Sequence, residues 1–152
     1  GRNRLYVLDR SRGAVLLLDD NLKVSRTYSG DKEFKGFRDF YLTADGLWAL
    51  DSLNRTLTRF AENGQPLRKI KLANRLMFPV AFAVDATGQF YLLDRHAGQV
   101  VVFNNQGGFS YAFLLKGKRT GQLWYPGSLL FDWQGRLCVV NEGNGRVDIY
   151  GR

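Results

Sequence analysis

The sequence is poor in the residues that mark several common classes of protein. It has one cysteine, one histidine and three prolines in 152 residues. A single cysteine, Cys138, excludes an internal disulfide, and no Cys/His cluster has the spacing of a zinc site. We expect Cys138 to be a small core side chain at an inward-facing strand position.

Long apolar runs and helical periodicity are missing as well. The sequence has no run of 18 apolar residues and no leading charged-then-apolar export signal, so it predicts no membrane span. No stretch places apolar residues at the 3.6-residue spacing of an amphipathic helix. Hydrophobic residues at 45% and charged residues at 24% are typical of a globular chain. These features favour a folded protein that contains almost no helix.

One short pattern occurs four times along the chain. Its copies are residues 5–9, 47–51, 90–94 and 137–141, each an apolar run that ends in Asp or Asn. The closing residues Asp9, Asp51, Asp94 and Asn141 lie 42, 43 and 47 residues apart. Repeats of this length are typical of propellers, solenoids or arrays.

Each copy divides into short strands separated by turns rich in Gly, Asn and Asp. The third copy is the clearest, with strands expected over 80–85, 90–94, 100–103 and 109–115. Four antiparallel strands in about 43 residues describe a propeller blade. We therefore predict an all-β fold of four-stranded antiparallel blades at about 4–36, 37–77, 78–124 and 125–152, with 14 strands in an incomplete ring.

The copies resemble the NHL repeat, a β-propeller family, over nearly the whole chain. The third copy matches the family pattern at Pro79, Asp85, Gly88, Asp94, Val100 and Phe103. The fourth copy matches it at Pro126, Asp132, Gly135, Asn144, Arg146, Val147 and Tyr150. The second copy has Phe37 in place of the opening Pro, and the first copy keeps only Asp9, Val15 and Asp19.

This resemblance implies a ring of about six blades, of which the chain supplies an incomplete part. We expect further sequence of a parent chain, or a second chain, to complete the ring. Similarity to exported bacterial propellers of this family points to a periplasmic, cell-surface or secreted setting, although the compartment stays open.

Charge is distributed unevenly over the predicted blades. The net charge is +8, and blade topology places the strand 2–3 turns and the inter-blade links on one rim, which we call the turn-and-link rim. The opposite rim carries mainly acids: Asp19, Asp20, Asp45, Glu62, Asp85 and Asp132. A basic rim attracts anions. The candidate partner-binding residues on it are Arg10, Arg12, Lys35, Arg55, Arg75, Arg95, His96, Lys116, Lys118, Arg119, Trp124 and Arg146.

Three functions are compatible with this pattern. The first, which we favour, is a non-catalytic scaffold that binds a protein through the turn-and-link rim. The second is an RNA-binding or polyanion-binding module, in which basic residues hold phosphates and nearby aromatic rings stack on bases. The third is a fragment of a metal-dependent lyase or hydrolase. Segment 116–119 interrupts the repeat and is the best local candidate for a contact.

An internal role for the same residues is the alternative to binding. Each turn arginine would then pair with a strand-end carboxylate, and Asp9, Asp51, Asp94 and Asn141 would be structural, accepting N–H bonds from the turns. No set of residues has the spacing of a catalytic triad or a phosphate-binding loop. We therefore expect no catalytic residue, no metal, no cofactor and no enzyme activity in this segment.

Overall fold

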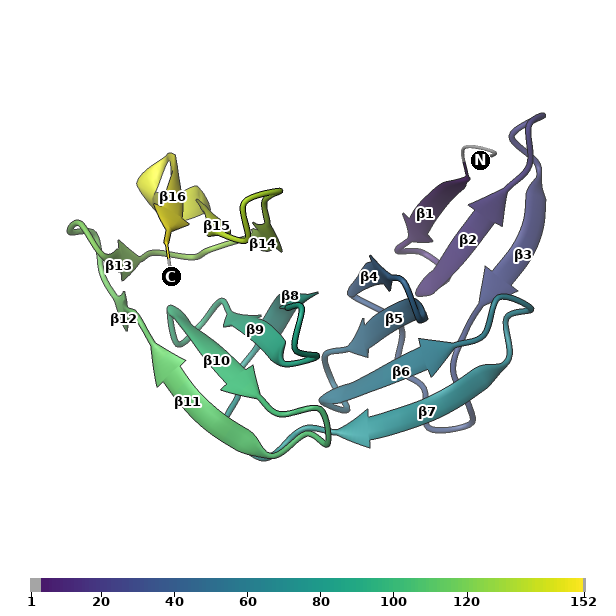
Figure 1. Cartoon of the computed structure of the whole chain (residues 1–152), viewed down its shortest axis with the longest axis horizontal. Coiled ribbons are helices and arrows are strands. Elements are labelled where there is room, and N and C mark those ends of the chain that lie inside the picture. The colour runs from purple at the N-terminus through teal and green to yellow at the C-terminus, as the bar shows by residue number, and fades with distance from the viewer. Residues whose placement is uncertain (1–3, 152) are drawn as a thin grey trace. The chain divides into compact units, whose positions relative to one another are not determined.

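The structure is a computed structural model that describes residues 4–151, and it consists almost entirely of antiparallel β-sheets (Figure 1). The chain divides between Ile70 and Lys71 into two compact units. The predicted all-β fold built from propeller-type blades is confirmed. No helix within residues 4–151 has the length and apolar character needed to cross a membrane.

The first unit contains two sheets. A three-stranded sheet has the order β1 (Leu5–Asp9), β2 (Ala14–Leu18) and β3 (Val24–Tyr28). A four-stranded sheet follows in the order β4 (Asp39–Thr43), β5 (Gly46–Asp51), β6 (Thr56–Phe60) and β7 (Pro66–Lys71). Each strand lies beside the next strand in the chain, which is the topology of a propeller blade.

The core of the first unit joins these two sheets through aromatic side chains. Tyr28 of β3 meets Phe60 of β6 edge-on, with 5.6 Å between the ring centroids. Phe37, in the link before β4, meets Phe60 in the same way at 5.7 Å. Alternate residues of a strand face opposite sides of a sheet, so Val15 and Leu17 of β2 both reach this core. Burying one such large apolar side chain is worth about 1.5–3 kcal/mol, so the packed seam stabilises the pair of blades.

The second unit also contains a four-stranded and a three-stranded sheet. The first has the order β8 (Pro79–Val84), β9 (Phe90–Asp94), β10 (Gln99–Phe103) and β11 (Phe109–Phe113). The second has the order β14 (Ser128–Phe131), β15 (Leu137–Asn141) and β16 (Arg146–Tyr150). A single 3₁₀ turn, η1 (Glu142–Asn144), joins β15 to β16.

The link between these two sheets has structure that the sequence did not predict. It contains β12 (Leu115–Lys116) and β13 (Gln122–Leu123), which pair in parallel. Residues 4–151 therefore contain 16 strands, compared with the 14 expected for the chain. The two extra strands are two residues long each, too short to show an alternating pattern in the sequence.

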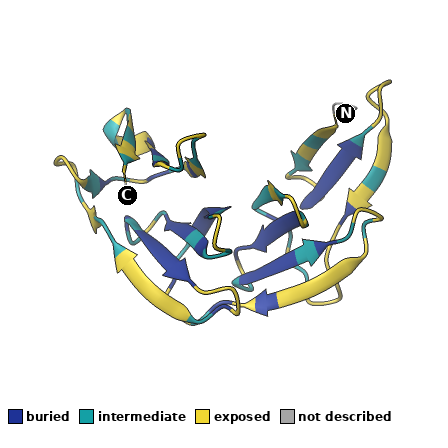
Figure 2. Cartoon of the chain, viewed as in Figure 1, coloured by how far each residue is buried: buried dark blue, intermediate teal, exposed yellow. Residues whose placement is uncertain are grey.

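Burial follows the position of a strand within its blade (Figure 2). The two middle strands of each four-stranded sheet, β5 and β6 or β9 and β10, are largely buried, whereas the outermost strands β7 and β11 are largely exposed. The expectation for Cys138 is wrong, because its neighbours Leu137 and Val139 are the buried residues and Cys138 is only half-buried. Its cross-strand partners Leu130 and Ile149 share its exposed sheet face.

Candidate functional site

The repeated polar residue at the end of the second blade strand joins a turn to a link. The carboxylate of Asp94 is fully buried and accepts backbone N–H bonds from Met77 and Phe78 in the preceding link, at 2.5 and 3.2 Å. It also accepts N–H bonds from His96 and Ala97 in the turn after β9, at 3.2 and 3.0 Å. One side chain thus accepts hydrogen bonds from four backbone donors, two in the link and two in the turn.

The other blades repeat this arrangement with small changes. Asp51 accepts N–H bonds from Lys35 in the link at 3.0 Å and from Asn54 in the turn at 3.1 Å. Asn141 accepts from the backbone N–H of Trp124 at 2.9 Å. Asp9 is half-buried and bonds to its own turn, where the Ser11 hydroxyl and then the Arg12 N–H hold the pKa of this carboxyl below its ordinary value.

The turn arginines of the second unit serve the structure of the link over residues 114–127. Arg95 forms an ion pair with Glu142 at 2.9 Å, and the same nitrogen donates to the carbonyl oxygens of Tyr125 and Pro126. Arg146 pairs with Asp148 at 2.8 Å and donates to carbonyl oxygens of the same link. These two arginines therefore hold the link in place.

The acidic partner differs among the turn arginines Arg12, Arg95 and Arg146. Arg12 lies 3.4 Å from Asp9, whereas the acidic partners of Arg95 and Arg146 are Glu142 and Asp148. Neither acid belongs to the repeated pattern, so the sequence did not identify them as the partners of these arginines.

Lys116, Lys118, Trp124 and Tyr125 form a cluster on the turn-and-link rim of the second unit, which we call the rim cluster. The Lys116 ammonium lies 5.5 Å from the centre of the Trp124 ring and 5.6 Å from that of Tyr125. The Lys118 ammonium lies 5.2 Å from the Trp124 ring. The two rings meet edge-on at 5.0 Å. Ammonium groups within about 6 Å of a ring centre are attracted by its negative face.

Tyr125 adopts an unusual backbone conformation, with φ at +45°. A bulky residue with positive φ is an outlier that costs about 1–3 kcal/mol and is found most often at functional sites. Arg95 binds the carbonyl of this residue at 2.9 Å and so helps to hold the strained peptide in place. The ring of Tyr125 remains exposed as a result.

The lysines of the rim cluster have no acidic partner in the described chain. None of the ion pairs within residues 4–151 involves Lys116, Lys118 or Arg119. All three are exposed. Their positive charges are therefore available to an anionic group from outside the chain.

The remaining candidates are spread over both units. Arg10, Lys35 and Arg12 are exposed in the first unit, and Arg55 there is half-buried with a positive φ. In the second unit Arg75 lies over the ring of Phe109 at 4.8 Å, and His96 stacks on Phe78 at 4.9 Å. Of the predicted residues, the structure thus brings together Lys116, Lys118 and Trp124.

Tyr125, the first residue of the fourth predicted copy, belongs with them. Among residues 4–151, no group of three or more His, Cys, Asp or Glu side chains lies close enough together to hold a metal ion.

Comparisons with known proteins identify the fold and no family. No family model matches the chain, and no curated protein is similar in sequence, so the likeness to the NHL repeat stays a resemblance. Solved structures match over nearly the whole chain. Virginiamycin B lyase from Staphylococcus aureus matches with a TM-score of 0.68 and 14% identity, over 99% of this chain and 52% of the lyase.

Two other matches have different activities. Glutaminyl cyclase from Myxococcus xanthus has a TM-score of 0.67 at 12% identity, over 98% of this chain and 70% of the cyclase. The WD40 β-propeller domain of Doa1 has a TM-score of 0.70 at 16% identity, over 99% of this chain and 47% of that one. The chain thus spans about half the length of the lyase and of the WD40 domain.

These matches correct one expectation from the sequence. We expected the chain not to be an enzyme, and that inference is wrong, because the proteins that share its fold include a lyase and a cyclase. At 12–14% identity these enzymes establish only that the chain has a β-propeller fold.

Proposed function

We propose that the chain is a propeller interaction module that binds an acidic segment of a protein partner through the rim cluster. One observation carries the proposal: two lysine ammonium groups are held over the rings of Trp124 and Tyr125, and no described carboxylate neutralises them. The Doa1 domain, a WD40 propeller, is similar in fold.

Holding the lysines in place makes them better binding groups. A free lysine side chain loses up to about 2 kcal/mol of rotamer freedom when it is fixed by a ligand. Lys116 and Lys118 are already restrained by their rings, so part of this cost is met before binding. A carboxylate that reaches them forms charge-assisted hydrogen bonds, which are about twice as strong as neutral ones.

The same geometry favours an acidic peptide over single-stranded RNA. Base stacking requires an aromatic face that is free. The Trp124 ring already carries two ammonium groups, and the edge-on Tyr125 occupies another approach to it. Carboxylates need no ring face, because they can bind the lysines and Arg119 directly.

The test compares a peptide of eight glutamates with an eight-nucleotide RNA, both fluorescently labelled, by fluorescence anisotropy. The double variant Lys116→Glu with Lys118→Glu should weaken peptide binding by about tenfold or more, since like charges replace attraction with repulsion. A matched control is Lys23→Glu with Lys32→Glu, which changes the net charge equally at two exposed lysines of the first unit. The control should bind the peptide nearly as well as the unmodified chain.

Two results would overturn the proposal. One is peptide binding that the rim-cluster variant and the control weaken equally, because the attraction would then be to net charge alone. The other is tighter binding of the RNA, with log affinity falling by about 0.7 per phosphate contact for each tenfold rise in salt. That second result would establish the RNA-binding alternative in its place.

A further inference from the structure

An aromatic cavity of about 230 Å³ lies between the two sheets of the second unit. Five aromatic side chains line it, and they come from β9, β11, β14 and β16: Tyr91, Tyr111, Phe113, Phe131 and Tyr150. Drug-sized ligands occupy cavities of roughly 300–1,000 Å³, so this one suits a small molecule or a single chemical group. We call it the aromatic cavity.

The blade pattern explains why these rings converge. In the third copy the residue three before the strand-end Asp faces the following blade, and in the fourth copy the residue nine after the strand-end Asn faces the preceding blade. Tyr91 precedes Asp94 by three residues, and Tyr150 follows Asn141 by nine. Tyr91 meets Phe131 of the next sheet edge-on at 5.0 Å. The cavity is thus a regular feature of the contact between two blades.

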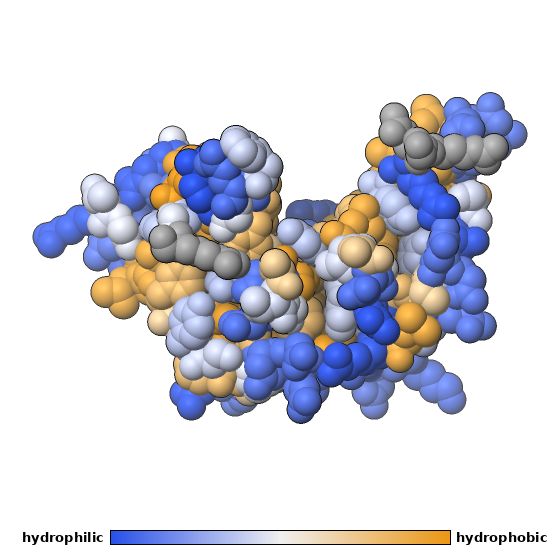
Figure 3. All heavy atoms as spheres, viewed as in Figure 1, coloured by the Kyte–Doolittle hydropathy of each residue, from blue (hydrophilic) through white to orange (hydrophobic). Residues whose placement is uncertain are grey.

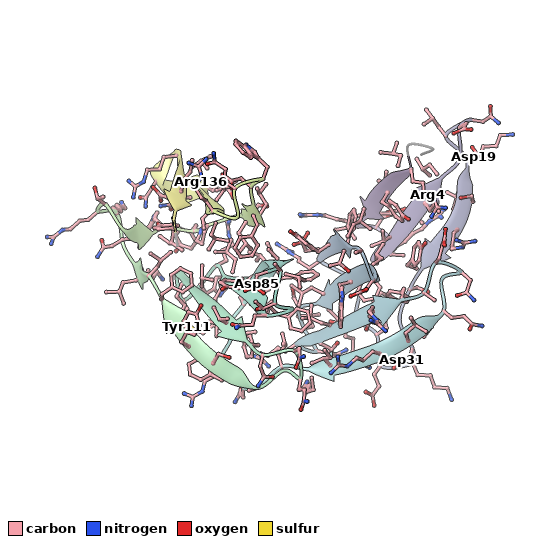
Figure 4. The ribbon with its side chains drawn as sticks, in the orientation of Figure 1. Arg4, Asp19, Asp31, Asp85, Tyr111 and Arg136 are labelled. Carbon is pink, nitrogen blue, oxygen red and sulfur yellow. The ribbon has the colours of Figure 1, made fainter. Side chains whose placement is uncertain are left out.

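A carboxylate lies directly behind the rings. The Tyr91 hydroxyl lies 3.3 Å from Asp85 and 3.3 Å from the hydroxyl of Tyr111. Figure 4 labels Asp85 and Tyr111, which belong to the same blade. Burial alone would raise the pKa of Asp85, but hydrogen bonds from Thr87, Gln89 and Tyr91 together lower it, so this carboxylate is charged at neutral pH.

The lining contains no positive charge to oppose this carboxylate. Lysine, arginine and histidine are all absent from the lining residues, which belong to the described chain. The nearby Arg136 pairs with Asp132 at 2.7 Å. The Tyr150 hydroxyl is shielded from solvent and has no hydrogen-bond partner within residues 4–151. The cavity therefore presents ring faces and phenol oxygens, and the Asp85 carboxylate lies outside its lining, behind the Tyr91 hydroxyl.

We propose that the aromatic cavity binds a quaternary ammonium group, carried by a small molecule or by a trimethylated lysine side chain. Such a cation has a weakly hydrated, apolar surface that packs against aromatic rings while its charge is attracted to their faces. The Asp85 carboxylate adds to this attraction through the Tyr91 hydroxyl. A primary ammonium is more strongly hydrated and would lose hydrogen bonds on entering.

The first unit provides an internal comparison. A larger cavity, of about 450 Å³, is lined there by residues at the same repeat positions: Tyr6, Tyr28, Leu42, Leu47 and Phe60. Arg4 also lines that cavity, in an ion pair with Glu62. Leu42 there takes the place of Phe131, and the lining carries charges of both signs, from Arg4, Asp45 and Glu62. Because a quaternary ammonium needs ring faces around it, it should prefer the more aromatic cavity of the second unit.

The experiment titrates the chain with choline and with 3,3-dimethylbutan-1-ol, a neutral molecule of the same shape, and follows amide NMR signals. Choline should bind at least about fivefold more tightly, corresponding to a cation–π contribution of ~1 kcal/mol. Tyr111→Ala should weaken choline binding by about fivefold or more. Trp133→Ala removes an aromatic ring that is 88% exposed and outside the cavity, so it should leave binding unchanged.

Two further measurements identify the molecule that carries the cation and the role of the Asp85 carboxylate. A short peptide with trimethyl-lysine, compared with the same peptide carrying unmodified lysine, shows whether a protein side chain reaches the cavity as well as free choline does. Tyr91→Phe removes the hydroxyl that reaches Asp85, so it should reduce the preference for choline over the neutral analogue.

Equal affinity for choline and its neutral analogue would overturn the proposal, as would binding that Tyr111→Ala does not weaken. Signal changes confined to the first unit would also overturn it. The rim cluster shares no residue with this cavity, so these outcomes are independent of those for the proposed function.

Discussion

At the scale of single residues, Arg55 occupies a backbone conformation that the other copies give to glycine. The last residue of each strand 2–3 turn has positive φ: +62° at Gly13, +63° at Gly98, +64° at Gly145 and +52° at Arg55. A side chain in this region costs roughly 1–2 kcal/mol, because Cβ crowds the following carbonyl. Arg55 is therefore a strained site in the second blade.

We predict that Arg55→Gly is more stable than Arg55→Ala by about 1 kcal/mol, after allowing for the greater freedom of glycine in the unfolded chain. Both variants lose the arginine side chain, so their difference isolates the backbone. The free energy of unfolding in urea measures it. An alanine variant as stable as the glycine variant would show that the turn relaxes to remove the strain.

The sequence contained the information for this site, because the four copies align in register. At the scale of the repeat, strand ends and turn glycines could be predicted from alternation and composition alone. Arg55 was instead interpreted by its charge. Cys138 is the opposite case. Residues 137–140 are all apolar, so the sequence does not show which of them face inward, and the structure buries Leu137 and Val139 instead of Cys138.

At the scale of the blade, the strand-end carboxylate is the feature that joins consecutive elements. Asp94 binds two N–H groups of the link and two of the turn, whereas Asp9 binds only its own turn. Removing a buried acceptor leaves each donor unsatisfied, which costs about 1–3 kcal/mol per group. The two aspartates should therefore differ in their importance to stability.

We predict that Asp94→Ala lowers the free energy of unfolding by at least about 3 kcal/mol, because four backbone N–H groups lose the buried carboxylate that accepts from them. Asp94→Asn should lose less, since one oxygen still accepts and the fourth blade carries Asn141 at this position. Asp9→Ala is the matched control at an exposed turn and should lose about 1 kcal/mol. Thermal or urea unfolding measures all three, and an equal loss at Asp9 and Asp94 contradicts the assignment.

The structure of the link over residues 114–127 could be predicted only in part from the sequence. The sequence identified segment 116–119 as a break in the repeat, and this break lies in the rim cluster. The pairing of β12 with β13 and the ion pair of Arg95 with Glu142 could not be predicted, because both depend on residues that only the folded topology brings together. The local sequence pattern therefore predicts the strands of each blade, whereas the arrangement of the rim cluster depends on contacts between residues far apart in the sequence.

At the scale of the whole molecule, the exposed apolar surface is the main feature. Apolar areas lie beside hydrophilic ones in the space-filling view (Figure 3). The sheet of β14, β15 and β16, which we call the fourth sheet, has one face of exposed aliphatic residues: Leu130, Val140, Val147 and Ile149. Contiguous apolar surface on a folded protein usually marks a place where another surface packs.

We predict that the chain self-associates through this face at high concentration. Val147→Lys with Ile149→Glu should reduce the association constant by about tenfold or more, because two charged side chains would have to be removed from water in the contact. Both positions are more than half exposed, so the folded chain should tolerate the change. Sedimentation velocity over a range of concentrations measures the association.

Leu67→Glu with Leu115→Lys is the matched control, since both leucines are exposed and lie outside the fourth sheet. It changes two apolar residues to the same pair of charges, so it tests whether association depends on this face or on exposed apolar area in general. If both double variants reduce association equally, the contact is non-specific. An unmodified chain that stays monomeric throughout would contradict the prediction that this face self-associates.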